Sequence, residues 1–170
     1  MRTRPLMKSK LAPLFLLPSL LLGGCHVSLP ISEAVAVPVS ADEAAALDEQ
    51  TRPSTPGKWF QVRATLTRDA VHKIARWELY THMVVEDCRS GDLVGIASSA
   101  GIEGTGGDFE RIRQKLEADE QRQTFVIAEP VFFPASKAVD RLCVRLEGGS
   151  YTLQKISSSP IALHVAGRSG

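Results

Sequence analysis

A two-residue alternation of apolar and polar side chains constrains the fold of this chain more than any other feature. In residues 58–67, "KWFQVRATLT", apolar side chains recur at every second position from Phe60 to Leu66, with polar ones between them. Successive side chains of a β-strand point to opposite faces, so this period predicts a half-buried strand. Further apolar runs of strand length occupy residues 76–88, 92–98, 123–133, 140–156 and 160–165.

These runs predict an all-β domain over residues 58–166. The run at 140–156 supplies two strands, because Gly148 and Gly149 interrupt its alternation and can adopt the positive φ of a tight hairpin. About seven strands joined by short connections are typical of a β-sandwich. We therefore expect a β-sandwich of about seven mostly antiparallel strands.

One segment, residues 108–120, departs from the strand pattern. Phe109, Ile112 and Leu116 recur at helical spacing, and Asp108 precedes them as a suitable N-cap. The same residues also alternate as a strand would, but less regularly. The pattern favours a short helix that covers one end of the sandwich.

The first residues of the chain have the features of a secretory signal. Four basic residues precede an apolar run at 11–22, and two glycines follow the run. The run has twelve residues, whereas a membrane-spanning helix needs about 20. A basic start, a short apolar stretch and small residues at its end predict a signal peptide over residues 1–24.

Leu22, Gly23, Gly24 and Cys25 resemble the lipobox of bacterial lipoproteins. The resemblance implies that the chain is cut before Cys25 and that this cysteine carries the lipid. Several acyl chains on one residue anchor a protein stably in a membrane. His26 follows the cysteine where an aspartate would favour the inner membrane, so the resemblance implies an outer-membrane anchor with the domain on the periplasmic side.

Residues 26–57 have the composition of a linker. They contain four prolines, five acids, one arginine and no Phe, Tyr or Trp. We therefore expect residues 25–57 to be the lipidated cysteine followed by a flexible tether. Ser40 and Glu43 match a capping box, but an isolated helix of about ten residues is marginal in water.

The two remaining cysteines and the net charge indicate in which compartment this protein works and which kind of partner it can bind. Cys88 and Cys143 predict one disulfide in an oxidising compartment, the alternative being two buried free thiols. The segment before Cys25 holds four of the 20 basic residues and none of the 19 acids, so the mature chain carries 16 bases against 19 acids, a net charge of −3. A net negative charge argues against nucleic acid as a partner.

No set of residues with catalytic spacing is found in the predicted mature chain. It contains no HExxH, GxSxG or SxxK pattern, and its adjacent acids are typical of a solvated surface. Neither remaining cysteine has a neighbouring Cys or His at the spacing of a zinc site. We therefore expect a protein that is not an enzyme and that binds no metal or cofactor.

A glycine-rich connection, residues 98–110, is the longest irregular segment expected on the domain. Long loops on a rigid β-scaffold commonly carry binding sites. The outward face of the strand predicted at 76–88 is the second candidate surface. The candidate partner contacts on these two surfaces are Ile102, Glu103, Asp108, Glu110, Tyr80 and His82.

The layout of a small, lipidated, disulfide-bonded and acidic β-domain resembles that of periplasmic immunity lipoproteins and lipidated lysozyme inhibitors. The chain lacks the Ser-Gly-x-x-Tyr loop of those inhibitors. The resemblance implies a protein-binding module that neutralises a toxin or enzyme attacking the cell envelope. The alternative is a structural or assembly lipoprotein, such as a pilotin-like subunit of a secretion complex. In both cases the expected partner is a periplasmic protein.

Overall fold

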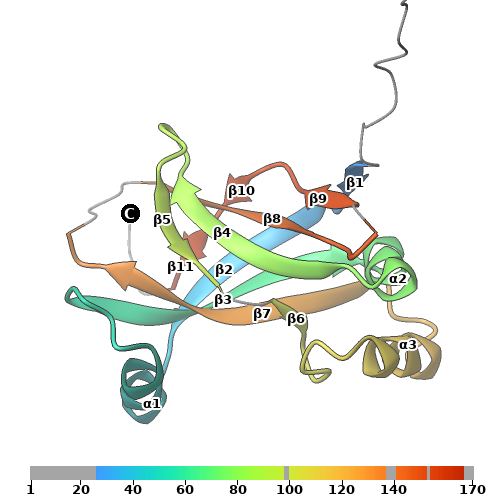
Figure 1. Ribbon diagram of the computed structural model, residues 1–170, viewed down its shortest axis with the longest axis horizontal. Coiled ribbons are helices and arrows are strands. Elements are labelled where there is room, and N and C mark those ends of the chain that lie inside the picture. Colours follow the sequence, from blue (N-terminus) through green and yellow to red (C-terminus); the bar gives the residue numbers. More distant parts are fainter. Residues whose placement is uncertain (1–25, 98–99, 137–140, 153, 167–170) are drawn as a thin grey trace, which may run out of the picture.

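The computed structural model describes residues 26–97, 100–136, 141–152 and 154–166, and these form two packed β-sheets with three helices (Figure 1). The six-stranded sheet contains β1 (His26–Ser28), β4 (Tyr80–Asp87), β5 (Leu93–Ile96), β8 (Leu142–Gly149), β9 (Lys155–Ser157) and β10 (Ile161–Ala162). The five-stranded sheet contains β2 (Ile31–Pro38), β3 (Gly57–Thr67), β6 (Gly101–Ile102), β7 (Thr124–Pro134) and β11 (His164–Val165). The helices are α1 (Ala41–Thr51), α2 (Arg68–Trp77) and α3 (Phe109–Ala118).

The prediction of a β-rich fold is confirmed, but the sheets are mixed and the domain is not all-β. The strand orders are β1-β9-β8-β4-β5, with β10 on β8, and β11-β2-β3-β7-β6. Most neighbours are antiparallel, whereas β1 with β9 and β11 with β2 are parallel. The described residues form more strands than the seven expected, and two helices besides the one expected near 108–120.

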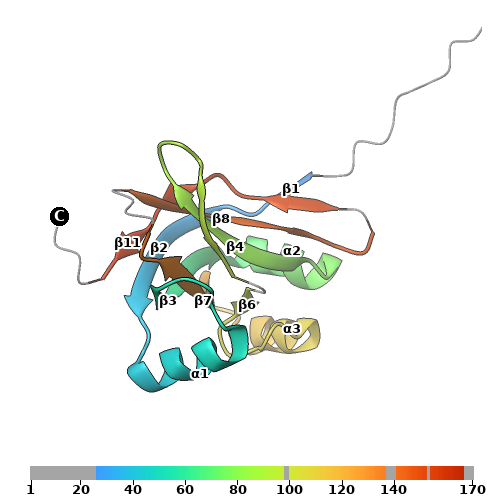
Figure 2. The same cartoon turned by 60° about the vertical axis from the view of Figure 1, so that its left-hand side comes forward.

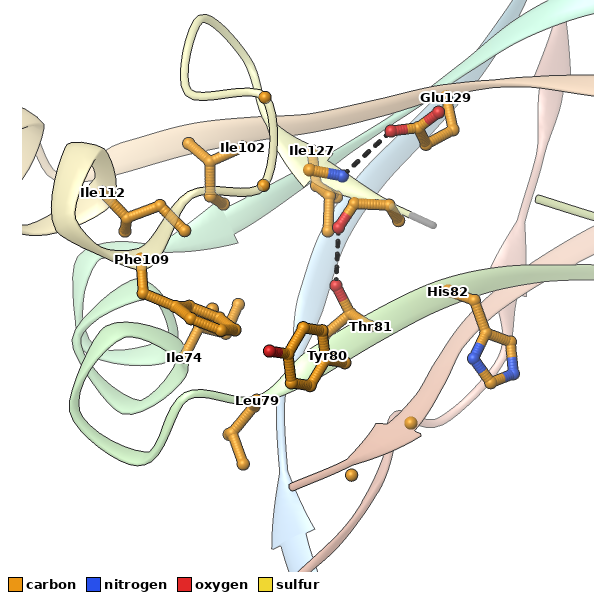
Figure 3. Close-up of a pocket in the computed structure, with 16 residues that line it drawn as sticks. Ile74, Leu79, Tyr80, Thr81, His82, Ile102, Phe109, Ile112, Ile127 and Glu129 are labelled. Carbon is orange, nitrogen blue, oxygen red and sulfur yellow. Dashed lines mark hydrogen bonds between the residues drawn. The ribbon is translucent and has the colours of Figure 1, made fainter. Parts of the chain in front are cut away.

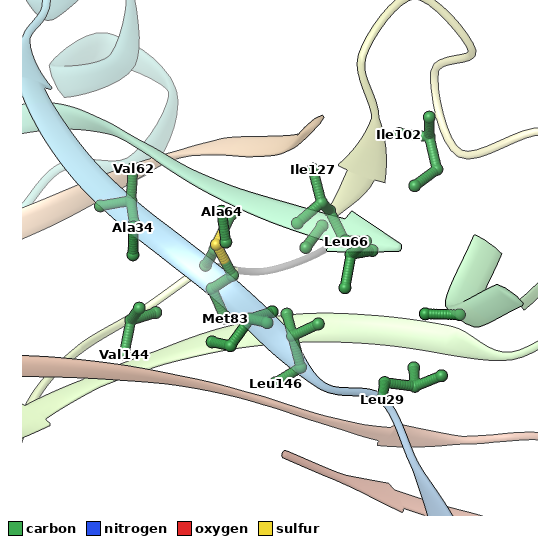
Figure 4. Packing of buried hydrophobic residues seen from close by; sticks show 14 of the residues in the cluster. Leu29, Ala34, Val62, Ala64, Leu66, Met83, Ile102, Ile127, Val144 and Leu146 are labelled. Carbon is green, nitrogen blue, oxygen red and sulfur yellow. The ribbon is translucent and has the colours of Figure 1, made fainter. Parts of the chain in front are cut away.

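The core lies between the two sheets, where the period-two alternation places apolar side chains. On β3 every second residue from Val62 to Leu66 is buried, as predicted. Figure 4 shows these side chains facing those of the other sheet, including Met83, Val144 and Leu146. Close packing of the two faces is the main source of stability in such a domain.

The prediction of a flexible tether is wrong over residues 26–51. β1 pairs with β9 and β2 pairs with β3, so this segment completes both sheets. Leu29 and Ala36 are fully buried and Ala34 nearly so. The linker-like composition is misleading because the small side chains of Ala and Val fit a crowded interior, while the acids of the segment lie on exposed positions such as those of α1. The described fold therefore includes the residues from His26 onward, and the predicted lipidation site, Cys25, lies outside the described residues.

Helix α1 lies on the side of the five-stranded sheet that faces away from the other sheet (Figure 2). The Ser40 hydroxyl accepts a hydrogen bond from the backbone N–H of Glu43, as the capping pattern predicts. None of its residues is buried. The indole N–H of Trp59 donates to Asp48 at 2.8 Å and ties the helix to β3, which helps to hold a helix that would be marginal alone.

Helix α2 was not expected, because residues 76–79 were interpreted as the start of a strand. Thr67 caps the helix by accepting from the N–H of Ala70. Its buried residues are Ala70, Val71, Ile74 and Ala75, a helical rather than a two-residue spacing. Glu78 ends the helix in the left-handed conformation, so the next strand begins only at Tyr80.

Helix α3 confirms the prediction of a helix near 108–120. Its buried residues, Ile112 and Leu116, are those of the helical spacing. The guanidinium of Arg113 donates to the carbonyl of Ala75 at 3.1 Å and joins α3 to α2. Both helices lie at one end of the sandwich (Figure 1). Within the described part of the chain, no helix is long and apolar enough to cross a membrane.

The predicted disulfide between Cys88 and Cys143 is present, with a Cα–Cα separation of 5.0 Å. It connects the residue after β4 to the second residue of β8, the neighbouring strand. The side chain of Asp87 accepts from the backbone N–H of Arg89 and so shapes the loop 89–93 that follows. The disulfide therefore lies at the end of β4 opposite to Tyr80.

The predicted hairpin at 140–156 exists, but its turn is not formed by Gly148 and Gly149. Both glycines belong to β8 and lie opposite Tyr80 and Thr81 of β4. Gly148 has a φ of 150°, and a side chain there would collide with the backbone of Tyr80. Glycine is therefore needed here for the close approach of two strands, and the connection to β9 spans residues 150–154.

Residues 160–165, predicted as one strand, cross from one sheet to the other. Ile161 and Ala162 pair with β8, whereas His164 and Val165 pair with β2. Leu163 lies between them and is buried. An alternation of three apolar residues shows that one face is buried, but it does not show which strand is the neighbour.

Candidate functional site

A cavity of about 410 Å³ opens at the end of the sandwich that carries α2 and α3 (Figure 3). Residues of β4, β6, β7 and β8 contribute to its walls, as do residues of the two helices. Its size is within the range of sites that bind small molecules or single side chains. The large aliphatic residues of its walls are Ile74, Leu79, Ile102, Ile112 and Ile127.

The two surfaces that the sequence singled out meet at this cavity. Tyr80 and His82 come from the face of β4, and Ile102, Gly106 and Gly107 come from the glycine-rich segment. Ala100 is joined to β4 by two hydrogen bonds, one from its own N–H to the Thr81 carbonyl and one from the Thr81 hydroxyl to its carbonyl. The segments are therefore parts of one site rather than alternatives.

Three acidic candidates in residues 98–110 are held in local contacts and do not line the cavity. Glu103 forms an ion pair with Arg63 at 2.7 Å. Glu110 pairs with Arg113 at 3.1 Å. Asp108 accepts from the N–H groups of Glu110 and Arg111 at the start of α3. Exposed pairs of this kind contribute little to stability, and they reduce the negative charge available to a partner.

The expectation that residues 98–110 form one long irregular loop is wrong for the described residues 100–110. Gly101 and Ile102 form β6 and pair with β7, and Ile102 is only 2% exposed. A tight turn follows, in which the Thr105 hydroxyl donates to the Ile102 carbonyl at 2.7 Å. Ile102 is thus a wall of the cavity and part of the core, not an exposed contact.

Replacing Asp108 by alanine should lower the free energy of unfolding by about 1 kcal/mol, because two N–H groups of α3 lose their acceptor. Asparagine at the same position can still accept and should restore most of the loss. Urea denaturation of the two variants measures the difference. Equal stability of Asp108→Ala and wild type would contradict the capping role.

Aromatic side chains form the rim of the cavity. The ring of Tyr80 meets that of Phe109 edge to face, with centroids 5.0 Å apart, and that of Tyr151 at 5.2 Å. Tyr80 is 50% exposed and Tyr151 is 86% exposed. The sequence interpretation had placed Tyr151 in a strand, and only the position of the turn shows that it is exposed beside Tyr80.

His82 is half-buried on β4, and its ring is mainly neutral at pH 7. Burial lowers the pKa of its imidazole, and the positive charge of Arg145 lowers it further. Its Nε2 lies 3.5 Å from a carboxylate oxygen of Glu147. Arg145 also contacts Glu147, so this carboxylate is largely neutralised and does little to favour a charged His82.

Glu129 is an acidic residue of the cavity that sequence reasoning missed. It lies on β7, and its Oε1 accepts from the backbone N–H of Gly101 at 3.1 Å. Burial raises the pKa of its carboxyl, and this hydrogen bond opposes the rise in part. A signal was present, because Glu129 is in phase with the buried residues Ile127 and Val131.

This arrangement has the features of a binding site. It combines aliphatic walls, an aromatic rim and one half-buried carboxylate, whereas the ring of His82 points away from the other lining side chains (Figure 3). The Thr81 hydroxyl, a further polar group of the lining, donates to a carbonyl. Among the described residues, no group of three His, Cys, Asp or Glu side chains is placed to hold a metal ion.

Comparison with known proteins identifies no relative of this chain: no family model, no curated protein and no solved structure matches it. The cavity and its rim are therefore the basis for a functional proposal. Their geometry defines what can bind, through the size of the cavity, the exposed tyrosines and the sign of the buried charge.

Proposed function

We propose that this protein is a lipid-anchored lipoprotein of the cell envelope whose domain binds a partner protein at the cavity and its tyrosine rim. The observation that carries the proposal is an exposed tyrosine, Tyr80, in the lining of a preformed cavity, with a second exposed tyrosine, Tyr151, in ring contact with it. Tyrosine is enriched among the residues that dominate binding energy at protein interfaces. A cavity beside such residues can accept a side chain of the partner.

The place where the chain enters the fold supports a partner at the membrane surface. β1 runs parallel to β9, with His26 opposite Lys155, so the chain enters at the end that carries the 150–154 connection. Tyr80 lies opposite Gly149 at this same end, together with α2 and the cavity (Figure 1). An anchor on Cys25 would therefore hold the cavity close to the membrane, without an intervening tether.

An immunity or inhibitor protein is the type of binding protein that we favour. A rigid site close to the membrane suits stoichiometric capture of a protein that attacks the envelope there, since a preorganised site binds with little loss of conformational entropy. The alternative, a structural or assembly lipoprotein, requires the same kind of surface but a different partner. The identity of the captured protein separates the two.

The proposal predicts that Tyr151→Ser weakens partner capture by about tenfold or more, because loss of a central interface tyrosine commonly costs over 1.4 kcal/mol. The full-length protein is cross-linked in envelope fractions, and partners captured by wild type and variant are quantified by mass spectrometry. Val37→Ser is the matched control, since Val37 is an exposed residue of β2 outside the cavity.

Capture that depends on Tyr151 but not on Val37 supports the proposal. An envelope toxin or enzyme as the captured protein supports the inhibitor role, and a subunit of an envelope assembly supports the alternative. Equal capture by all three proteins, with their folds intact by circular dichroism, would exclude the tyrosine rim as the binding surface.

A further inference from the structure

We infer that the cavity binds a primary ammonium group on an aliphatic stem, as in a lysine side chain, with the Glu129 carboxylate as its counter-ion. The inference rests on the proposed function and deepens it, because it specifies the chemistry of the partner. Four properties of the site carry it: the position of Glu129 in the sheet, the absence of a basic partner for it among the described residues, the geometry of its carboxylate and the walls around it.

Glu129 lies on the face of the five-stranded sheet whose neighbouring residues belong to the core. On β7 it lies opposite Val62 of β3, which is fully buried, and directly paired residues share one face of a sheet. Its neighbours in phase, Ile127 and Val131, are also buried. An ionised carboxylate on this face loses hydration, and this loss must be offset by a partner.

No protein cation supplies that partner within the described residues. Arg63, on the neighbouring strand, is paired with Glu103 at 2.7 Å. The mainly buried Glu86 provides an internal comparison, since its carboxylate receives the guanidinium of Arg145 at 2.9 Å. Among the described residues, the backbone N–H of Gly101 is the one hydrogen-bond donor to the Glu129 carboxylate, which borders the cavity (Figure 3).

The geometry of the carboxylate favours an ammonium over a guanidinium. Because Gly101 donates to Oε1, one acceptor site of that oxygen is occupied, which restricts the approach of a guanidinium that must align with both oxygens at once. A lysine ammonium acts as a compact charge with three rotatable donors, so it can pair with one carboxylate oxygen without the planar two-bond geometry. His82 does not compete for this role, since its ring is mainly neutral at pH 7.

The walls of the cavity suit the stem of such a ligand. Ile102, Ile112 and Ile127 offer aliphatic surface to a chain of methylene groups. Tyr80 and Phe109 stand at the mouth with their rings in contact, and aromatic faces attract a cation that passes or rests there. A flexible four-carbon stem can therefore bury its methylenes while its charged end reaches Glu129.

The test uses the purified full chain and four probes: n-butylamine, Nα-acetyl-lysine N-methylamide, Nα-acetyl-arginine N-methylamide and the neutral analogue 1-butanol. Isothermal titration calorimetry measures each affinity at pH 7. We expect both primary amines to bind about tenfold or more tightly than 1-butanol, and the lysine derivative more tightly than the arginine derivative. Tighter binding of the lysine derivative than of n-butylamine points to a side chain of a protein, and the reverse points to a free alkylamine.

Glu129→Gln is the decisive variant. Glutamine can still accept the hydrogen bond from Gly101, but it carries no charge. Because burial raises the pKa of Glu129, its ionised form disfavours folding at neutral pH, so the variant should be at least as stable as wild type. Its affinity for n-butylamine should fall to that for 1-butanol. The matched control, Glu103→Gln, removes an acid that Arg63 already neutralises and should leave both affinities unchanged.

A second experiment measures the pKa of the Glu129 carboxyl with and without the amine. A bound ammonium stabilises the carboxylate, so n-butylamine should lower the pKa of Glu129 when its carboxyl carbon is followed by NMR. The affinity for the amine should therefore decrease as the pH falls through this pKa. Tyr80 and His82, both on β4, are the other titratable residues that line the cavity, and the pH dependence should persist in His82→Gln.

Equal binding of amine and alcohol, or an amine affinity that Glu129→Gln leaves unchanged, would overturn the inference. These results are distinguishable from failure of the proposed function. Partner capture that depends on Tyr151 but not on Glu129 would retain the protein-binding function and reject the ammonium site. Amine binding that depends on Glu129, without any partner captured through Tyr151, would retain the site and reject the protein-binding function.

Discussion

Replacing Leu29 by alanine should lower the free energy of unfolding by about 2–5 kcal/mol, the usual range for loss of a fully buried leucine side chain. Leu29 is 0% exposed and lies between β1 and β2, where the chain passes from one sheet to the other. The truncation removes apolar contacts and leaves a cavity that the surrounding sheets can close only in part. Urea denaturation of the full-length variant measures the effect.

The matched control is Leu47→Ala in α1, a helix without buried residues. This second truncation of a leucine should have a distinctly smaller effect, because less apolar surface is lost from contact with protein. The comparison also tests whether residues 26–57 act as a tether. In a flexible tether neither leucine would contribute more than about 0.5 kcal/mol, the usual limit for surface substitutions.

Removing the disulfide should lower the free energy of unfolding by about 4 kcal/mol, the value that the chain-entropy model gives for a loop of this length. Cys88 and Cys143 are 55 residues apart, so the bond restricts a large part of the unfolded chain. Domains of this size are stable by about 5–15 kcal/mol in total, which makes the loss a considerable share. The double variant Cys88→Ala/Cys143→Ala avoids an unpaired thiol.

Thermal unfolding with and without dithiothreitol measures this contribution. The reductant should destabilise wild type and leave the double variant unchanged. His82 of the cavity lining and Cys88 are six residues apart along the strand, about 20 Å at the rise per residue of a strand. The amine affinity of the folded double variant should therefore remain that of wild type. A wild-type midpoint that does not respond to the reductant would show that the bond does not stabilise the native state.

The strands and the helix with strong local patterns could be predicted from the sequence. β3 and α3 appear where the periods of two and 3.6 residues place them, because each pattern records one buried face. β2 was missed for a local reason. A register shift between Ile31 and Glu33 moves the buried residues from odd positions to the even positions of Ala34 and Ala36, so no continuous alternation is visible.

The candidate site could be predicted only in part. Tyr80 and His82 were candidates as a second surface, separate from the glycine-rich segment, and the structure places both in the lining of the same cavity as that segment. Glu129 and Tyr151 were missed. An acid in a buried phase of a strand was a usable signal for Glu129, but the exposure of Tyr151 depends on a turn that lies beyond the two glycines.

The sequence by itself determined the elements whose cause is local: the alternating strands, the capped helix at Asp108 and the pairing of two cysteines in one small domain. Only the tertiary structure decided which faces oppose each other. Gly101 and Glu129 are 28 residues apart, and their hydrogen bond depends on β6 pairing with β7. That no basic side chain of the described residues pairs with Glu129 likewise depends on which chain segments surround the cavity. A local pattern shows which side of an element is buried, whereas a site requires the packing of several elements, and packing is a property of the whole fold.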